Sequence, residues 1–327
     1  MKQTRRDFVR TLFVASQGIV ASRFLPGRLF AETGPAPSAA LNFLVFGDWG
    51  RQGEPDQAQV AEQMGKVAHD MDAKFVISVG DNFYDNGVAS TQDKHWRKSF
   101  EEVYTAPSLQ VPWYVTLGNH DYRGDCDSQI AYSRLSRRWN MPARYFWLSK
   151  KIDASTTADF FFLDTNPMIR EYREKDKEGT REKILAQDVP KQLAWFRESL
   201  AVSEAQWKIV VGHHPIYSGG DHGDSPELIE SILPLLEQYK VQVYFNGHDH
   251  DLQHLVAGNV NLIDSGAGSR VRPTKETPHT RFALSSSGFT AVSLQADQMD
   301  IRMVDNNGKT VYSTAIPRIP VVVVKDE

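Results

Sequence analysis

Short apolar runs recur along the chain, and several of them end in a glycine with polar side chains close behind it. Runs of this length, rich in Val, Ile and aromatic residues, are typical of buried β-strands. The pattern predicts strands at 41–46, 75–79, 111–117, 207–211 and 241–245. Ligand sites in open α/β sheets form outside the carboxyl ends of the strands, so the polar segments that follow these runs indicate a functional site.

Between these strands the apolar positions change to helical spacing. Residues 55–72 and 93–103 have this pattern, and it returns before the last two strands. The apolar positions of those two later helices are Val189, Leu193, Phe196, Leu200, Leu228, Ile232, Leu235 and Tyr239. Amphipathic helices of this kind pack one face on a sheet, so the alternation predicts an α/β fold.

The last third of the chain has strands with few helical signals between them. We expect strands at 260–264, 288–294, 299–304 and 310–316, with a hairpin turn at Asn306-Asn307-Gly308. These strands predict a second, more antiparallel sheet that completes a sandwich. With no internal repeat and no linker, 41–320 is expected to be one domain, followed by a tail at 321–327.

The densely charged segment 170–182 has two readings. It is interpreted here as a solvated loop or helix face, and the alternative is a loop that lies over the site.

Composition excludes some classes of function. The chain has 327 residues, is 41% hydrophobic and carries a net charge of −4. No block of Lys or Arg indicates a nucleic-acid partner. Cys126 is the one cysteine, so the chain forms no intramolecular disulfide, and a catalytic thiol is not expected.

The first residues resemble a bacterial twin-arginine export signal. Arg5 and Arg6 precede Phe8 and a modestly apolar stretch at 11–21, which is too short to span a membrane. We expect a signal peptide at 1–31, with cleavage after Ala31 or nearer Ala39, and a Pro- and Gly-containing linker at 32–40. The predicted location is periplasmic or secreted, with the Tat translocase as partner during export and no permanent membrane span.

The polar segments after the predicted strands contain metal-ligand side chains. Asp48 and Asp81 each follow a glycine, which lets the chain turn sharply and approach a ligand closely. Two neighbouring ions need a bridging ligand, and Asp81 is the predicted bridge. Tyr84 follows three residues later, and a phenol with pKa near 10 binds only a strongly Lewis-acidic ion as phenolate.

The donor types predict two different ions. Asp48, Asp81, Tyr84 and one imidazole offer three anionic donors, which suits a trivalent ion such as Fe(III). The shared Asp81, the amide oxygen of Asn119 and two imidazoles suit a divalent ion such as Fe(II), Zn or Mn. Seven of the ten histidines lie within 120–254, and as a set they indicate metal binding: His120, His213, His214, His222, His248, His250 and His254.

These segments together resemble a purple acid phosphatase of the metallophosphoesterase (calcineurin-like) superfamily, in particular the small tartrate-resistant type. The resemblance covers nearly all of 41–320. It includes Phe-Phe-Leu-Asp-Thr at 161–165, Gln-Leu-Ala-Trp at 192–195, Gly-His-Asp-His-Asp-Leu-Gln at 247–253 and Ser-Gly-Ala-Gly at 265–268. Most members of the superfamily have Asp-x-His in the first motif. Here Gly50 stands at the histidine position and Tyr84 takes its place, which marks the purple subgroup.

The resemblance implies a fold, a ligand set and an activity. The fold is a four-layer α/β/β/α sandwich of two mixed sheets flanked by helices. The implied iron ligands are Asp48, Asp81, Tyr84 and His250, and the implied divalent-ion ligands are Asp81, Asn119, His213 and His248. His120 and His222 match the histidines that act on the phosphate. The implied activity is hydrolysis of phosphate monoesters, with a small phosphate ester as substrate.

The sequence also departs from the tartrate-resistant type. Tyr122 stands in place of a histidine, His214 in place of an aromatic residue, and the cysteine pair of the regulatory loop is missing. Phosphodiester hydrolysis and phosphate or metal binding without turnover are the alternative functions.

Overall fold

The computed structural model describes residues 40–176 and 178–319. The predicted export signal, most of the predicted linker and the predicted tail lie outside these ranges. Among the described residues no helix combines the length and the apolar character needed to cross a membrane.

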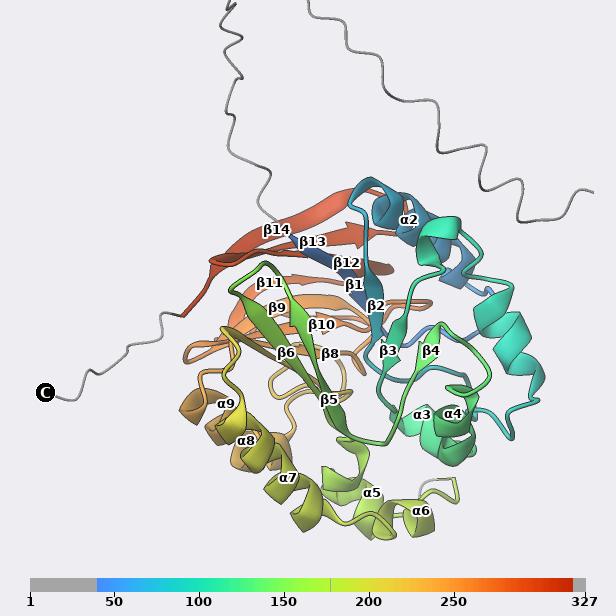
Figure 1. Ribbon diagram of the computed structural model, residues 1–327. Coiled ribbons are helices and arrows are strands. Elements are labelled where there is room, and N and C mark those ends of the chain that lie inside the picture. Colours follow the sequence, from blue (N-terminus) through green and yellow to red (C-terminus); the bar gives the residue numbers. More distant parts are fainter. Residues whose placement is uncertain (1–39, 177, 320–327) are drawn as a thin grey trace, which may run out of the picture. The chain divides into compact units, whose positions relative to one another are not determined.

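Two mixed sheets of seven strands form the centre of the fold (Figure 1). The first has the order β14-β13-β12-β1-β2-β3-β4, and the second has the order β11-β9-β10-β8-β7-β6-β5. The strands of the first sheet are β1 (Leu41–Phe46), β2 (Phe75–Ser78), β3 (Trp113–Val115), β4 (Trp139–Asn140), β12 (Gly288–Leu294), β13 (Gln298–Asp305) and β14 (Thr310–Pro317). Those of the second are β5 (Phe146–Lys151), β6 (Thr157–Phe162), β7 (Trp207–Val211), β8 (Val243–Asn246), β9 (Leu252–Ala257), β10 (Val260–Ser265) and β11 (Thr280–Leu284).

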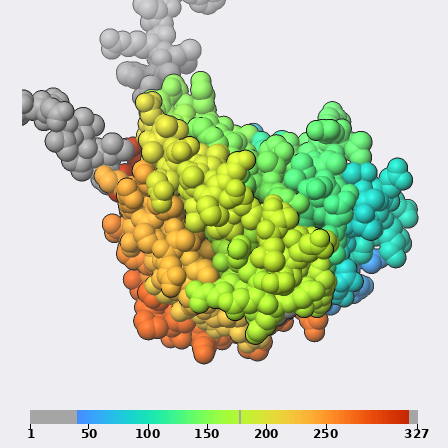
Figure 2. Space-filling model, turned by 90° about the horizontal axis from the view of Figure 1, so that it is seen from below, coloured from blue at the N-terminus to red at the C-terminus, as the bar shows by residue number. Residues whose placement is uncertain are grey.

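Helices cover the outer face of each sheet. The α-helices are α2 (Gln57–Asp70), α3 (Asn119–Arg123), α4 (Cys126–Tyr132), α5 (Arg170–Glu174), α6 (Arg181–Leu185), α7 (Val189–Val202), α8 (Pro226–Ser231) and α9 (Leu233–Gln238). A π-helix at Trp96–Glu101 and 3-10 turns at Pro107–Leu109 and Asn166–Met168 complete the set. Seen from below, α5, α6 and α7 form much of the surface that faces the viewer (Figure 2).

Three clusters of buried apolar side chains define four layers. In β1, Phe43 and Val45 face a cluster shared with the second sheet, while Leu44 and Phe46 face a cluster that includes α2. A third cluster joins the outer face of the second sheet to α7, α8 and α9. Because both faces of the central strands are buried, their sequences are almost continuously apolar. The predicted α/β/β/α sandwich is confirmed.

The prediction that all the C-terminal strands build the second sheet is wrong. Of the four strands expected in the last third of the chain, only β10 belongs to that sheet, whereas β12, β13 and β14 extend the first one. Strand β12 pairs antiparallel with β1, from Leu41 opposite Leu294 to Val45 opposite Thr290. Since β2 covers only one edge of β1, β12 satisfies the backbone groups on its other edge. The hairpin turn between β13 and β14 is where it was expected, with Gly308 at φ +82°.

The single helix expected around 228–239 is instead two short helices, α8 and α9. Pro234 lies in the first turn of α9 and has no backbone N–H to donate to the preceding turn. Its ring also clashes with a continuing helix, so the chain breaks at Ile232 and starts again.

Candidate metal centre

The seven predicted metal ligands come from loops that follow strands of both sheets. Asp48 follows β1, Asp81 follows β2, and Asn119 begins α3 after β3. In the second sheet, His213 follows β7, and His248 and His250 follow β8. Tyr84 lies three residues beyond Asp81. The structure brings all seven together, so the site lies where the carboxyl ends of strands from two sheets meet.

Three of these residues have an unusual backbone conformation. Asp48, Asp81 and His248 have φ values of +60°, +49° and +75°. A non-glycine residue in the left-handed region costs about 1–3 kcal/mol and persists mainly where surrounding structure enforces it. The strain at this site is therefore consistent with selection for side-chain placement.

Two glycines next to proposed ligands lie so close to a carboxylate that no side chain fits there. A Cβ on Gly118 would lie 2.1 Å from Oδ1 of Asp81, and a Cβ on Gly247 would lie 2.4 Å from Oδ2 of Asp48. Side chains at either position would displace a carboxylate.

One group of donors surrounds the hydroxyl of Tyr84. This oxygen lies 2.9 Å from Oδ1 of Asp48, 2.8 Å from Oδ2 of Asp81 and 3.1 Å from Nε2 of His250. Nε2 of His250 lies 3.4 Å from Oδ1 of Asp48. These four side chains match the predicted iron set.

A second group of donors surrounds Nε2 of His213. This nitrogen lies 3.2 Å from Oδ1 of Asn119, 3.2 Å from Nδ1 of His248 and 3.6 Å from Oδ1 of Asp81. Nδ1–H of His213 donates to the Val79 carbonyl at 2.9 Å, which leaves Nε2 as the lone-pair nitrogen. Asp81 therefore faces one group with Oδ2 and the other with Oδ1.

Burial disfavours the charged forms of Asp48 and Tyr84 unless a cation lies beside them. Burial is the main cause that raises the pKa of Asp48 to about 7, and burial also raises the pKa of Tyr84 far above its usual value. Burial opposes ionisation of Asp81, but His213 and His120 hold the pKa of Asp81 below its usual range. Burial, with a contribution from Arg272, lowers the pKa of His250 to about 3. Neutral imidazoles beside closely spaced carboxylates form a donor set that metal ions bind.

The residues present therefore fit a metal centre. In the part of the chain that the structure describes, neither Asp48 nor Asp81 forms an ion pair with Lys or Arg. Uncompensated buried carboxylates are costly, and a metal ion removes that cost.

His214 is a further donor near the second group, because it clusters with His213 and His248. Its Nδ1 lies 2.8 Å from the Thr165 hydroxyl, and its Nε2 lies 3.2 Å from the Tyr172 hydroxyl. Both ring nitrogens thus have partners of their own, and we do not include His214 among the ligands.

The two predicted catalytic histidines border the donor groups. His120 donates from Nδ1 to the Asp85 carbonyl at 2.6 Å, and its ring lies 4.2 Å from that of Tyr84. Its Nε2 lies 3.9 Å from Oδ2 of Asp81. The His222 ring stacks on His248 with 4.0 Å between centroids. Burial lowers the pKa of both histidines.

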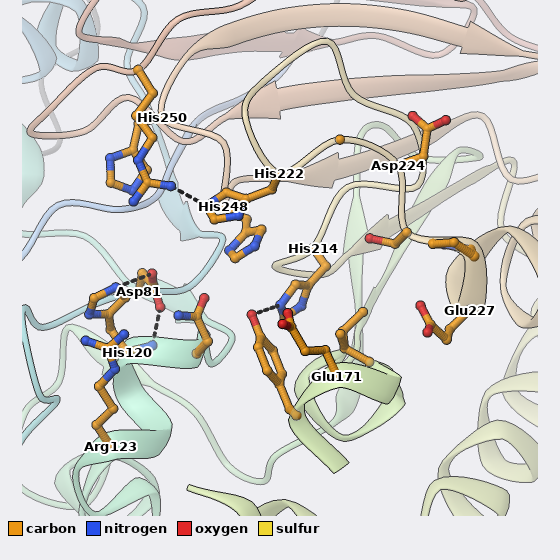
Figure 3. A pocket seen from close by; sticks show the side chains of 17 residues that line it. Asp81, His120, Arg123, Glu171, His214, His222, Asp224, Glu227, His248 and His250 are labelled. Atoms are coloured by element: carbon orange, nitrogen blue, oxygen red, sulfur yellow. Dashed lines mark hydrogen bonds and ion pairs between the residues drawn. The ribbon is translucent and has the colours of Figure 1, made fainter. Parts of the chain in front are cut away.

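A pocket of about 360 Å³ opens over these groups (Figure 3). Asp81, His120, His222, His248 and His250 line its inner part. In Figure 3, Asp224 and Glu227 lie on the side away from Asp81 and His120. The charged segment 170–182 is largely the solvated helix face that was expected, since α5 has no buried residue, and it also borders the pocket through Glu171 and Tyr172, as the alternative reading proposed.

Sequence reasoning missed several residues that support the site, and two carboxylates stand out among them. Asp121 accepts hydrogen bonds from the backbone N–H of Gly118 at 2.8 Å and of Asn82 at 3.1 Å, which ties α3 to the loop after β2. Asp249 accepts from the backbone N–H of His222 at 2.9 Å and from the Ser218 hydroxyl. Both aspartates lie inside recognised motifs, but their contacts are set by tertiary structure.

Comparison with known proteins agrees with this geometry. The family model described as calcineurin-like phosphoesterase matches residues 41–252. Purple acid phosphatase 4 of Arabidopsis thaliana is 39% identical over 291 residues, covering 85% of this chain and 84% of the relative. Tartrate-resistant acid phosphatase type 5 of Sus scrofa is 35% identical over 323 residues, covering 91% and 94%.

Solved structures share the fold. GAP50, described as the anchor in the inner membrane complex of Plasmodium, matches with a TM-score of 0.77 at 25% identity, covering 86% of this chain and 90% of that one. The purple acid phosphatase PPD1 from yellow lupin matches with a TM-score of 0.63 at 16% identity, covering 89% and 58%. By the family model and the curated relatives, the chain belongs to the calcineurin-like phosphoesterases and, within them, to the purple acid phosphatases.

Proposed function

We propose that this protein is an exported acid phosphatase that hydrolyses phosphate monoesters at a dinuclear centre of Fe(III) and one divalent metal. The observation that carries the proposal is the orientation of Asp81, whose two carboxylate oxygens face two different donor groups. A bridging carboxylate between two ions requires such an orientation. The proposed ligands are Asp48, Asp81, Tyr84 and His250 for iron, and Asp81, Asn119, His213 and His248 for the divalent ion.

The donor types support the two metal identities. Two carboxylates and a phenolate suit a trivalent ion, whereas the second group has one shared carboxylate, one amide oxygen and two imidazoles, which suit Fe(II), Zn or Mn. When bound, the two ions neutralise charge on the phosphoryl oxygens and supply a hydroxide nucleophile.

The chain's own residues orient the substrate and move the proton. His120 holds its Nδ1 proton toward the Asp85 carbonyl, so its Nε2 is the nitrogen available to the pocket. His222 is held over the site by its stacking on His248. We assign both histidines to charge stabilisation on the phosphate or to protonation of the leaving oxygen.

The export part of the proposal rests on the sequence of the N-terminus. Arg5, Arg6 and the apolar stretch at 11–21 support transport of the folded protein through the twin-arginine route to the periplasm or medium. Transport after folding suits an enzyme that takes up its metals before it crosses the membrane.

A non-catalytic role is the second candidate, because the Plasmodium protein with the similar fold is described as an anchor. Fold alone does not establish activity. A panel of phosphate monoesters and diesters, assayed between acidic and neutral pH on purified protein, tests the proposal. We expect monoester hydrolysis with the faster rates at acidic pH. Faster turnover of diesters would reject the monoesterase assignment, and no turnover by metal-loaded protein would favour the non-catalytic role.

A further inference from the structure

One arginine in the pocket, Arg272, belongs to no sequence motif and to neither donor group. It lies in the irregular segment between β10 and β11 and lines the pocket together with His222 and His250. Its guanidinium Nη1 contacts Nε2 of His222. Arg272 therefore presents hydrogen-bond donors to the same space as the two proposed catalytic histidines.

The backbone of Arg272 is fixed on both sides. Its N–H donates to the His250 carbonyl at 2.9 Å, and its carbonyl accepts from the Ser285 hydroxyl at 2.6 Å. The backbone of Arg272 is therefore held in place, and one of its two hydrogen bonds links it directly to His250, a proposed iron ligand. These two bonds place the Cα of Arg272 at the edge of the pocket.

Arg272 also has no anionic partner among residues 40–176 and 178–319, because its guanidinium contact is to an imidazole. The other arginine that lines the pocket, Arg123, forms an ion pair with Glu178 and donates to the Asp85 carbonyl at 3.0 Å. Of the two pocket arginines, Arg272 is thus the one whose charge is not already matched by a carboxylate.

The chemistry of phosphate esters indicates what Arg272 binds. A monoester has three non-bridging oxygens, and a diester has two. If two bound metal ions were to take two of these oxygens, a monoester would have one more that requires a donor. The planar guanidinium is the side chain best suited to a phosphate oxygen, because it offers charge and paired N–H groups.

We propose that Arg272 binds the third non-bridging oxygen of a phosphate monoester and so gives the enzyme a preference for monoesters over diesters. This inference rests on the proposed dinuclear phosphatase function and adds a substrate-binding residue that determines specificity. This role of Arg272 differs from that of His120 and His222, which are also proposed to protonate the leaving oxygen.

The test compares Arg272→Gln and Arg272→Lys with a matched control, Arg270→Gln, which changes an exposed arginine in the same segment. The measured quantities are kcat/KM for 4-nitrophenyl phosphate and for bis(4-nitrophenyl) phosphate. For Arg272→Gln we expect a loss of about 100-fold with the monoester, the size typical for one anion-stabilising donor, and less than about tenfold with the diester. Arg272→Lys should regain only part of the loss, because it keeps the charge without the planar fork. The control should match the wild type.

Binding of inorganic phosphate, measured by calorimetry, gives a readout that does not depend on turnover. Arg272→Gln should bind phosphate about tenfold more weakly or worse, with unchanged metal content and visible spectrum. Equal losses for the two esters, unchanged phosphate affinity, or loss of metal would each overturn the proposal. A wild-type protein that binds phosphate but hydrolyses neither ester would reject the proposed phosphatase function, and the phosphate affinities of the variants would then decide the role of Arg272.

Discussion

At the scale of single residues, Asp81 has the most connected position in the site. Its Oδ2 accepts from the Tyr84 hydroxyl at 2.8 Å, its Oδ1 lies 3.6 Å from Nε2 of His213, and the same oxygen accepts from the backbone N–H of His120 at 2.7 Å. The side chain of Asp81 thus faces both donor groups, one with each carboxylate oxygen. Substitutions at Asp81 should therefore affect both metals at once.

Asp81→Asn replaces the bridging carboxylate with a neutral amide of the same shape. We expect loss of both metals and nearly all activity, because an amide oxygen is a weak bridge between two cations. Asn119→Ala should lose mainly the divalent metal, since Asn119 contacts only the second donor group. Elemental analysis of the purified variants checks both results, and normal metal content in Asp81→Asn would mean that the bridging assignment is wrong.

The histidines at 120 and 222 should behave differently from the proposed ligands. His120→Ala and His222→Ala are expected to keep both metals while kcat falls about 10²–10⁴-fold, the usual contribution of a general acid. The residue that protonates the leaving oxygen should matter less for nitrophenyl phosphate than for an alkyl phosphate. Kinetics on both substrates, with metal analysis of each variant, separate the roles. If either variant lost metal, that histidine would be a ligand instead.

Site residues that follow an apolar run and a glycine could be found from the sequence, and site residues outside this pattern could not. Asp48 and Asp81 stood out because each follows a strand-like run and a glycine. Arg272 gave no such signal, since a single arginine in an irregular segment looks like any surface residue. Its place beside His222 depends on how two distant loops meet in three dimensions.

At the scale of elements, the loop at 218–223, which carries His222, is hydrogen-bonded to strand β9 of the second sheet. Buried Gln253, on β9, accepts from the Gly219 N–H at 2.8 Å and donates to the Ser218 hydroxyl at 3.0 Å. These bonds position the loop that carries His222, although Gln253 lies in neither donor group.

Gln253→Ala should loosen this loop without removing a proposed ligand. We expect kcat to fall about 10- to 100-fold, because a displacement near 1 Å of a catalytic group has an effect of this size. Metal content should not change. The control is Gln92→Ala at an exposed position. Wild-type kcat in Gln253→Ala would show that the loop is held without this residue.

The same scale shows which parts of the fold were readable from the sequence. Buried strands and amphipathic helices were predicted because burial sets their hydrophobic pattern. The assignment of strands to sheets could not be predicted. The hydrophobic pattern of β12 indicates that both of its faces are buried, but it does not indicate which strand lies beside it. Its pairing with β1 joins residues about 250 positions apart, such as Leu41 and Leu294, and local sequence carries no information on that contact.

At the scale of the whole molecule, the site depends on two sheets that approach each other. The loops after β1 and β2 supply the acidic ligands, and the loops after β7 and β8 supply the imidazoles. A bound metal centre would therefore link the two halves of the sandwich. For the same reason, the protein would need to be folded before it takes up its metals.

The proposed export route rests on the N-terminal sequence, and transport of a folded protein suits this order of events. Arg5→Lys combined with Arg6→Lys should hold the folded, active enzyme in the cytoplasm of a bacterial host, because the twin-arginine route depends on the arginine pair. Phosphatase activity in periplasmic and cytoplasmic fractions checks the outcome. Unchanged periplasmic activity would indicate a different route or no export.

The most direct test of the dinuclear centre is elemental analysis of the purified wild-type protein together with its visible spectrum. We predict about one iron and about one second metal per chain, and a violet or pink colour from charge transfer between the Tyr84 phenolate and Fe(III). Tyr84→Phe should lose this colour. A colourless, iron-free protein that is fully active would contradict the assignment of Tyr84 and, with it, the proposed Fe(III) site.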